Sequence, residues 1–280
     1  MSPVEKALWF IESHSAASIS LDDVARSACV SRYHLCRAFG AATGQSVMGY
    51  LRGRRLSKAA CALADGAADI FSVALGAGYG SHEAFTRAFR DQFGMTPEQL
   101  RAERCIEHIQ IVEPIAVAAA QPVGAIASPR FENGAPFLLA GSAGRHTFER
   151  SAEITQRWQR FFADFLCHPD RLPATLDAAL YGGYHNFDDE GNFDYLCAVR
   201  VAGSSGLPAE WSRLHVPEQR YAVFRHAEHI STIDRSWRSV WNAWLPASGQ
   251  SAADAPSFER LDRFDEQRGI GEIELWLAIE

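Results

Sequence analysis

Roughly the first hundred residues carry apolar side chains at the spacing of amphipathic helices. Over residues 3–13, Val4, Ala7, Leu8 and Ile11 recur every three or four positions, as on the buried stripe of a helix. Serine or threonine precedes several of these stripes and glycine follows them, as expected of helix caps. The pattern predicts an all-helical segment with helices over 3–13, 21–28, 31–43, 46–64, 70–77 and 81–93, and a short last helix opened by Thr96 and Pro97.

From about residue 129 the pattern changes to strand, helix, strand, strand, and then repeats. The first pass predicts strands over 136–141, 178–186 and 193–201, with a helix over 152–165. The second pass predicts strands over 219–226, 258–263 and 272–279, with a helix over 233–245. We therefore expect an all-α domain at 1–107, an apolar linker at 108–128 that packs against a domain, and an α+β domain at 129–280.

Two stretches of the helical segment, fifty positions apart, are variants of one sequence. Residues 31–44 read SRYHLCRAFGAATG and residues 81–94 read SHEAFTRAFRDQFG, so that Arg37 aligns with Arg87. Each copy follows a shorter apolar stripe and a tight turn, as in a helix-turn-helix unit. Two units suggest two recognition helices on successive major-groove faces of one DNA duplex, about one helical turn or ~34 Å apart, with no need for a dimer.

This segment resembles the DNA-binding domain of the AraC/XylS family. The resemblance rests on ISLDDVARSACVSRYHLCRAF, SVMGYLRGRRLSKAACALAD and VALGAGYGSHEAFTRAFRDQFGMTPEQLR. It implies a double helix-turn-helix domain that binds a double-stranded DNA operator, with RNA polymerase as an expected partner. Cys29 departs from the family, which has a glycine at this point of the turn, as this chain has at Gly78. A positive φ would be strained at a cysteine.

The resemblance also implies which side chains contact DNA. The base-reading positions are Tyr33, Cys36 and Arg37 on the first recognition helix, and His82, Glu83 and Arg87 on the second. Arginine is the commonest reader of guanine, because its planar fork matches two acceptors; the alternative for both arginines is a solvated surface position. Glu83 could accept from a cytosine or complement the helix dipole. Further contacts with DNA, mainly with phosphates, are expected of Arg32, Arg54, Arg55, Thr86 and Arg90.

The acidic charge lies in the second half of the chain. A formal net charge of −7 at first argues against nucleic acid. Residues 1–107, however, hold 12 Lys and Arg against 11 Asp and Glu, whereas the rest holds 15 against 23. No apolar run reaches the ~18 residues of a membrane span, no leader is evident, and the six cysteines form no CxxC pair. These features predict a cytoplasmic protein without a membrane partner, associated with the nucleoid when DNA is bound.

The second half resembles the GyrI-like small-molecule-binding domain. The resemblance rests on YGGYHNFDDEGNFDYLCAVRV, FERLD and EIELWLAIE, and the chain departs from the family at Ala278, where a proline is usual. An AraC-type domain followed by a GyrI-like domain is the Rob-like arrangement. The resemblance implies an effector, often a lipophilic cation, that binds in a groove between the two halves of the domain.

The last predicted strand places Glu274 and Trp276 on one face and aliphatic residues on the other. We expect the aliphatic face to pack on the two helices and the other face to line the groove. A carboxylate within an aromatic wall suits a cation, and Glu274 stands where the family has its central glutamate. The candidate walls, each of which could instead be ordinary core, are Tyr184, Tyr195, Trp241 and Trp276.

Other functions remain open from the sequence. His226 and His229 lack a third ligand at useful spacing, so no metal is expected. No Gly-rich phosphate loop and no GxSxG elbow is present, so no cofactor is expected and a regulator is favoured over an enzyme. By resemblance, Glu274 with Trp241 could instead serve a hydrolase, with the DNA-binding half for localisation or autoregulation. A third reading is a domain that binds a protein partner.

Overall fold

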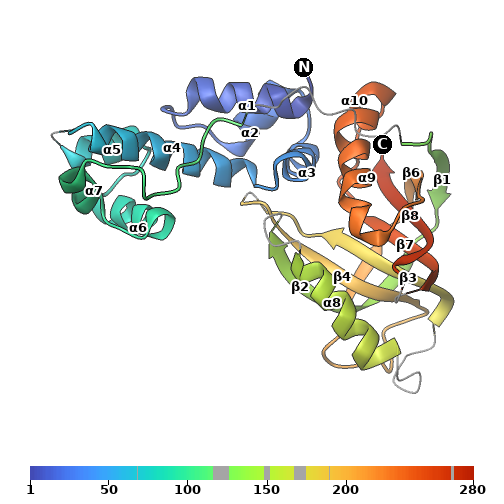
Figure 1. Cartoon of the computed structure of the whole chain (residues 1–280). Coiled ribbons are helices and arrows are strands. Elements are labelled where there is room, and N and C mark those ends of the chain that lie inside the picture. Colours follow the sequence, from blue (N-terminus) through green and yellow to red (C-terminus); the bar gives the residue numbers. More distant parts are fainter. Residues whose placement is uncertain (68, 116–125, 148–151, 167–174, 189, 266–267) are drawn as a thin grey trace. The chain divides into compact units, whose positions relative to one another are not determined.

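The computed structural model describes residues 1–67, 69–115, 126–147, 152–166, 175–188, 190–265 and 268–280 (Figure 1). The chain divides into two compact units. As far as the chain is described, the first holds residues 3–32 and 47–115, and the second holds residues 33–46 and those from 126 onward. Helix α3 (Arg32–Thr43), the predicted first recognition helix, therefore belongs to the second unit from Tyr33 onward.

The first unit is helical, as predicted. Its helices are α1 (Pro3–His14), α2 (Leu21–Ala28), α4 (Val47–Ala64), α5 (Ile70–Gly76), α6 (His82–Phe93) and α7 (Pro97–Glu103). The caps follow the sequence, since the Ser81 side chain accepts a hydrogen bond from the Ala84 amide and Thr96 forms a capping box with Gln99. No helix in the described part of the chain is both long and apolar enough to cross a membrane.

Helix α4 packs against both α6 and the described end of the linker. Leu56, Ala60 and Leu63 of this helix share a buried cluster with Phe85 and Phe89 of α6. The described end of the linker packs on the same helix, because the Val112 amide donates to Ser57 Oγ at 2.8 Å, which confirms the expectation for this part of it. Residues 116–125 of the linker lie outside the described residues.

The turn after α2 has a positive φ at Cys29, the position at which the chain departs from the family's glycine. Cys29 adopts a φ of 58°, in the left-handed region, and its counterpart Gly78 has a φ of 84°. The Cys29 amide donates to the carbonyls of Ala25 and Arg26, so the helix ends in the usual left-handed cap. The strain expected at Cys29 is therefore present. The five cysteines among the described residues are free thiols.

The second unit is built on an eight-stranded antiparallel sheet with the order β1-β6-β8-β7-β3-β4-β2-β5. The strands are β1 (Arg130–Gly134), β2 (Phe137–Thr147), β3 (Thr175–His185), β4 (Asn192–Val201), β5 (Ser212–Val216), β6 (Gln219–His226), β7 (Ser257–Asp265) and β8 (Ile270–Ile279). The predicted double pass is confirmed as β2-α8-β3-β4 and β6-α9-β7-β8 (Figure 1). The two outer strands, β1 and β5, were not predicted.

Two helical segments complete this unit. The first is α8 (Ala152–Phe161), which continues as a π-helical turn (Phe162–Leu166), and the second is α9 (Ile233–Ser239), which runs through a π-helical turn (Val240–Trp244) into α10 (Leu245–Ser248). A short 3₁₀ turn (Ile230–Thr232) precedes α9. Leu277 and Leu275 are fully buried, as predicted for the aliphatic face of β8.

Candidate functional site

A buried glutamate, Glu259, lies at the centre of the second unit, on the sheet face that meets the two helical segments. Its side chain is only 3% exposed. Its Oε1 accepts hydrogen bonds from the Tyr184 hydroxyl at 2.9 Å and the Trp237 indole N–H at 2.8 Å. Its Oε2 accepts from the Tyr195 hydroxyl at 2.9 Å, which in turn accepts from the Trp158 indole at 2.9 Å. Aromatic donors from α9, β3 and β4 thus converge on one carboxyl group, and a donor from α8 supports one of them.

Glycine at position 182 makes room for this network. Gly182 is paired directly with Glu259 across strands β3 and β7. A Cβ at this position would collide with the Tyr195 hydroxyl and lie 2.6 Å from Glu259 Oε2. The first glycine of the YGGY sequence is therefore required for the carboxylate and the phenol to meet.

Burial sets the protonation of the groups around the carboxylate. Desolvation raises the pKa of Glu259, although the bonds from Trp237, Tyr195 and Tyr184 act in the opposite direction. Desolvation also raises the pKa values of both tyrosines, which therefore stay protonated as donors. Nearby on α9, burial raises the pKa of Asp234, against the attraction of Arg238 and Arg37. Both carboxyl groups, that of the buried Glu259 and that of the more accessible Asp234, would gain from a cationic neighbour.

A cavity of about 330 Å³ opens above Glu259, and we call it the effector groove. Its walls are largely apolar and aromatic, and its floor is Glu259 with Tyr184 and Tyr195. The side chains that close it come from α8 and its π-helical turn, from the 3₁₀ turn before α9, and from the end of β7; they include Trp158, Phe162, Ile230 and Phe264. The groove can take an aromatic or alkyl ligand of moderate size.

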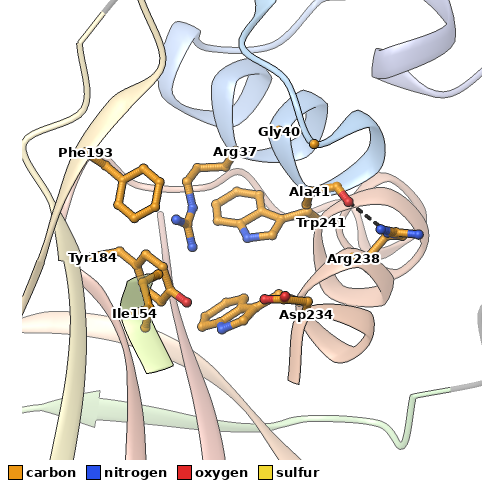
Figure 2. Close-up of a pocket in the computed structure, with 11 residues that line it drawn as sticks. Arg37, Gly40, Ala41, Ile154, Tyr184, Phe193, Asp234, Arg238 and Trp241 are labelled. Atoms are coloured by element: carbon orange, nitrogen blue, oxygen red, sulfur yellow. Dashed lines mark hydrogen bonds between the residues drawn. The ribbon is translucent and has the colours of Figure 1, made fainter. Parts of the chain in front are cut away.

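A second cavity of about 160 Å³ adjoins the groove and shares Ile154, Tyr184 and Asp234 with it (Figure 2). The Arg37 guanidinium of α3 points into it and is surrounded by aromatic rings, which we call the arginine cage. Its Cζ lies 4.2 Å from the ring centre of Tyr184, 4.9 Å from Phe187, 5.5 Å from Trp241 and 5.6 Å from Trp237. All four distances are within reach of cation-π attraction.

Other contacts hold α3 at the arginine cage. Arg238 Nε donates to the Ala41 carbonyl at 2.8 Å, as the dashed line in Figure 2 shows. The Tyr33 hydroxyl lies 3.4 Å from the Ala255 carbonyl, and its ring meets that of Trp241 edge-on with centres 5.9 Å apart. Cys36, the third residue of α3 expected to read bases, is 5% exposed. The predicted base-reading face of α3 thus lies against other elements of the second unit, to which α3 belongs from Tyr33 onward.

The structure brings together three of the predicted ligand residues. Tyr184 and Tyr195 line the effector groove, and Trp241 lines the arginine cage. Glu274 lies elsewhere, because it is paired across the strands with Arg260, the neighbour of Glu259, and so points to the opposite sheet face.

On that opposite face, Glu274 is engaged within the protein. Its Oε1 lies 2.8 Å from Arg130 Nη1, and its Oε2 accepts from the Trp276 indole at 3.0 Å. Trp276 is itself 7% exposed and stacks on Phe258 with ring centres 5.3 Å apart. The expectation that this face lines the groove is therefore corrected: the aliphatic face of β8 shares its side of the sheet with Glu259, and Trp276 is core.

The second recognition helix, α6, keeps its predicted DNA-contacting residues at the surface. Glu83, Arg87 and Arg90 are exposed, while Thr86 is partly buried. His82 Nε2 lies 3.1 Å from Glu98 Oε1. The pKa of Glu83 is lowered, first by a hydrogen bond from its own backbone N–H, as expected at a helix start. Contact between this helix and DNA stays a prediction.

Two arginines of α4 are held inside the first unit. Arg54 is 8% exposed and donates two hydrogen bonds to the Glu12 carboxylate, from Nε at 2.7 Å and from Nη2 at 3.0 Å. Arg55 donates to the Ser15 carbonyl at 2.7 Å and to the Ala17 carbonyl at 2.6 Å. These bonds argue against the predicted phosphate contacts, because both guanidinium groups already donate within the first unit. Arg32, by contrast, is exposed and lies 3.5 Å from Asp22 in a surface ion pair.

The histidines considered as metal ligands have other partners. His226 is 2% exposed, with Nδ1 at 2.9 Å from Ser236 Oγ and Nε2 at 3.1 Å from the His229 carbonyl. Within the described ranges, no group of three or more His, Cys, Asp or Glu side chains could hold a metal ion.

Sequence reasoning missed Glu259, Asp234 and Phe187. The segment FERLD carries charges at both 259 and 260, so alternation alone does not say which side chain faces the helices. One signal was present, namely the paired glycines in YGGY, since glycine within a strand often marks close approach by another group.

Comparison with known proteins connects both units to characterised families. A model described as a helix-turn-helix domain matches residues 24–103, and one described as an integron-associated effector binding protein matches residues 132–279. The transcriptional regulator Rob of Salmonella typhimurium strain LT2 is 31% identical over 267 residues, which cover 92% of this chain and 89% of that protein. The right origin-binding protein of Escherichia coli strain K12 is 42% identical with the same coverage. The regulatory protein SoxS of Escherichia coli strain K12 is 35% identical over 98 residues, or 35% of this chain and 92% of that protein.

Proposed function

The chain belongs to the AraC/XylS family of transcriptional regulators and carries an effector-binding domain behind its helix-turn-helix units, and from this premise we propose that a lipophilic cation in the effector groove controls its action on DNA. The operator is read by the two recognition helices, and the DNA-bound protein acts through RNA polymerase. Its relatives Rob and SoxS carry the names of regulators, which favours sensing over catalysis.

One observation carries the choice of a cation. Glu259 is a buried carboxyl group at the floor of a groove with largely apolar and aromatic walls, and a second carboxyl group, that of Asp234, also lines the groove. Desolvation disfavours its charged form until a positive charge arrives, so a bound cation supplies the missing partner. The surrounding rings add cation-π attraction and apolar contact area. A neutral ligand would gain only the apolar contact area.

A matched pair of ligands tests this proposal. Methyltriphenylphosphonium is a permanent lipophilic cation, and triphenylphosphine oxide is uncharged and of similar size. We expect isothermal titration to show tighter binding of the cation to the full-length protein. Its affinity should rise with pH through the titration of Glu259, because the deprotonated carboxylate attracts it and the raised pKa places that titration above the ordinary glutamate range.

The chain offers a matched pair of variants as well. Glu259→Gln keeps the shape of the side chain and removes its charge. It should lower the affinity for the cation by about 10- to 100-fold, the order of a lost charge-assisted contact. Glu274→Gln makes the same change on the opposite face, where the carboxylate is paired with Arg130, and should leave cation binding unchanged. Equal affinities for the two phosphorus compounds, or a loss in Glu274→Gln alone, would contradict the assignment.

A further inference from the structure

We propose that the arginine cage is a guanidinium-binding site whose resident is Arg37, and that an effector cation and Arg37 compete, so that the first recognition helix is withheld from DNA until an effector displaces it. This inference rests on the proposed function, since it assumes a cationic effector and a base-reading role for α3.

The first support is the state of the Arg37 side chain. It is 3% exposed, yet its Nε and Nη1 have no hydrogen-bond partner among the described residues. A buried arginine normally donates from all of its nitrogens, because the loss of hydration is otherwise uncompensated. Arg37 is held mainly by the faces of aromatic rings. Such an occupant is weakly retained and can exchange for another cation.

The internal repeat provides the second support. Arg87 stands at the position of α6 that corresponds to Arg37 in α3, and its side chain is exposed. The same residue at the same position of a repeated motif is therefore open to solvent in one copy and enclosed in the other. An arginine enclosed by four aromatic rings cannot present its fork to a guanine, so the docked α3 is incompatible with base reading.

The third support is that the cage and the groove share side chains. Tyr184 and Trp237 form two walls of the cage, and both also donate hydrogen bonds to Glu259 below the groove. Asp234 lines both cavities and interacts electrostatically with Arg37. Two positive charges so close repel each other and draw on the same carboxyl groups. Binding in the groove therefore weakens the hold on Arg37, and the reverse holds equally.

The chemistry of the cage defines the ligands it accepts. Flat rings above and beside the guanidinium suit a planar, delocalised cation that stacks, as guanidinium and amidinium groups do. A compact ammonium is more strongly hydrated and gains less from such walls. An effector that carries a guanidine or amidine group beside an aromatic or alkyl body could fill the cage and the groove together.

The repeat also supplies the matched control for the test. Arg37→Ala removes the internal competitor, whereas Arg87→Ala removes the corresponding arginine of α6, which is exposed and belongs to the other unit. We expect Arg37→Ala to bind methyltriphenylphosphonium about ten-fold more tightly than the wild type, if Arg37 fills the cage about nine-tenths of the time. Ethylguanidinium should bind to this variant and not measurably to the wild type. Arg87→Ala should match the wild type with both ligands, and Arg37→Gln should repeat the result of Arg37→Ala.

A direct readout follows Arg37 itself. In the full-length protein its Nε–Hε resonance should be displaced by the ring currents of the cage and should move to the position of a free arginine when methyltriphenylphosphonium is added. Trp241→Leu, which removes one wall, should shift this resonance without any ligand and should tighten operator binding by the ligand-free protein.

If the cation binds equally to the wild type, Arg37→Ala and Arg87→Ala, competition is refuted while the proposed function survives. If none of them binds the cation, the proposed function fails, and an unchanged operator affinity in Trp241→Leu would separately overturn the withheld helix.

Discussion

Replacing Gly182 with alanine should damage the centre of the effector-binding half out of proportion to the single methyl group added. The new Cβ would collide with the Tyr195 hydroxyl and come within 2.6 Å of Glu259 Oε2. Neither strand can retreat freely, because Gly182 is hydrogen-bonded within a register that includes β3, β4 and β7. The tyrosine and the glutamate must therefore separate.

The cost can be worked out from two contributions. Overpacking a close-packed site costs about 1–3 kcal/mol, and loss of a bond to a buried carboxylate adds about 1.5–3 kcal/mol. Since partial relaxation reduces both, we expect Gly182→Ala to lower the free energy of unfolding by about 2–4 kcal/mol. The cation should also bind more weakly, because the carboxylate no longer sits at the floor of the groove.

The neighbouring glycine provides the control. A Cβ at Gly183 comes close only to the end of the Leu214 side chain, at 3.0 Å, since its other two neighbours lie at ordinary contact distances of 3.9 and 4.0 Å, and the Leu214 side chain can move. Gly183→Ala should therefore cost less than about 1.5 kcal/mol and leave cation affinity unchanged. Urea unfolding followed by tryptophan fluorescence, with isothermal titration of methyltriphenylphosphonium, measures both quantities. Equal destabilisation by the two variants, or normal cation affinity in Gly182→Ala, would refute the view that this glycine exists to seat the carboxylate.

Three further outcomes are expected. Cys29→Gly should raise the free energy of unfolding by about 0.5–1 kcal/mol in urea titrations, because the residue has a φ of 58° that glycine adopts without strain; a loss of stability would contradict this. Arg54 lowers the pKa of Glu12 to about 2. The contribution of this ion pair to the free energy of unfolding is therefore fully present above pH ~4.5 and is lost as the pH falls toward 2. After allowance for solvent screening we expect ~1–2 kcal/mol, and Glu12→Gln should flatten this part of the stability profile. Arg87→Ala should weaken the operator complex by about 1–3 kcal/mol and relax preference at one base position; equal loss on random DNA would refute base reading.

The sequence was sufficient for the order and nature of the main elements, because each predicted helix and strand has its own periodicity and caps. The outer strands β1 and β5 escaped prediction because each has only five residues, too few for a strand pattern to stand out. They are stabilised as strands by pairing with β6 and β2, a non-local property.

The side chains of the site were harder to assign, for related reasons. Whether Glu259 or Arg260 faces the helices depends on the register with β3, where Gly182 sits opposite Glu259. Arg54 was expected to contact a DNA phosphate, but in the structure it pairs with Glu12, which lies 42 positions away in the sequence. Arg37 and Arg87 occupy the same place in the same motif, so no local pattern distinguishes the enclosed arginine from the exposed one.

The way the carboxylate of Glu259 is satisfied bears on selectivity. The donors that reach it, two phenols and an indole, already point at the carboxyl group and are not available to read the substituents of a ligand. Discrimination among ligands by hydrogen bonding requires donors or acceptors that would be left unpaired by the wrong compound. On the proposed function, the floor of the groove therefore selects ligands by charge sign and apolar area, while polar side chains of the walls, such as Thr155, Gln159 and Ser231, remain to read substituents. Cations that share charge and apolar area but differ in scaffold should therefore bind with similar affinity as long as they leave these wall groups in contact with water.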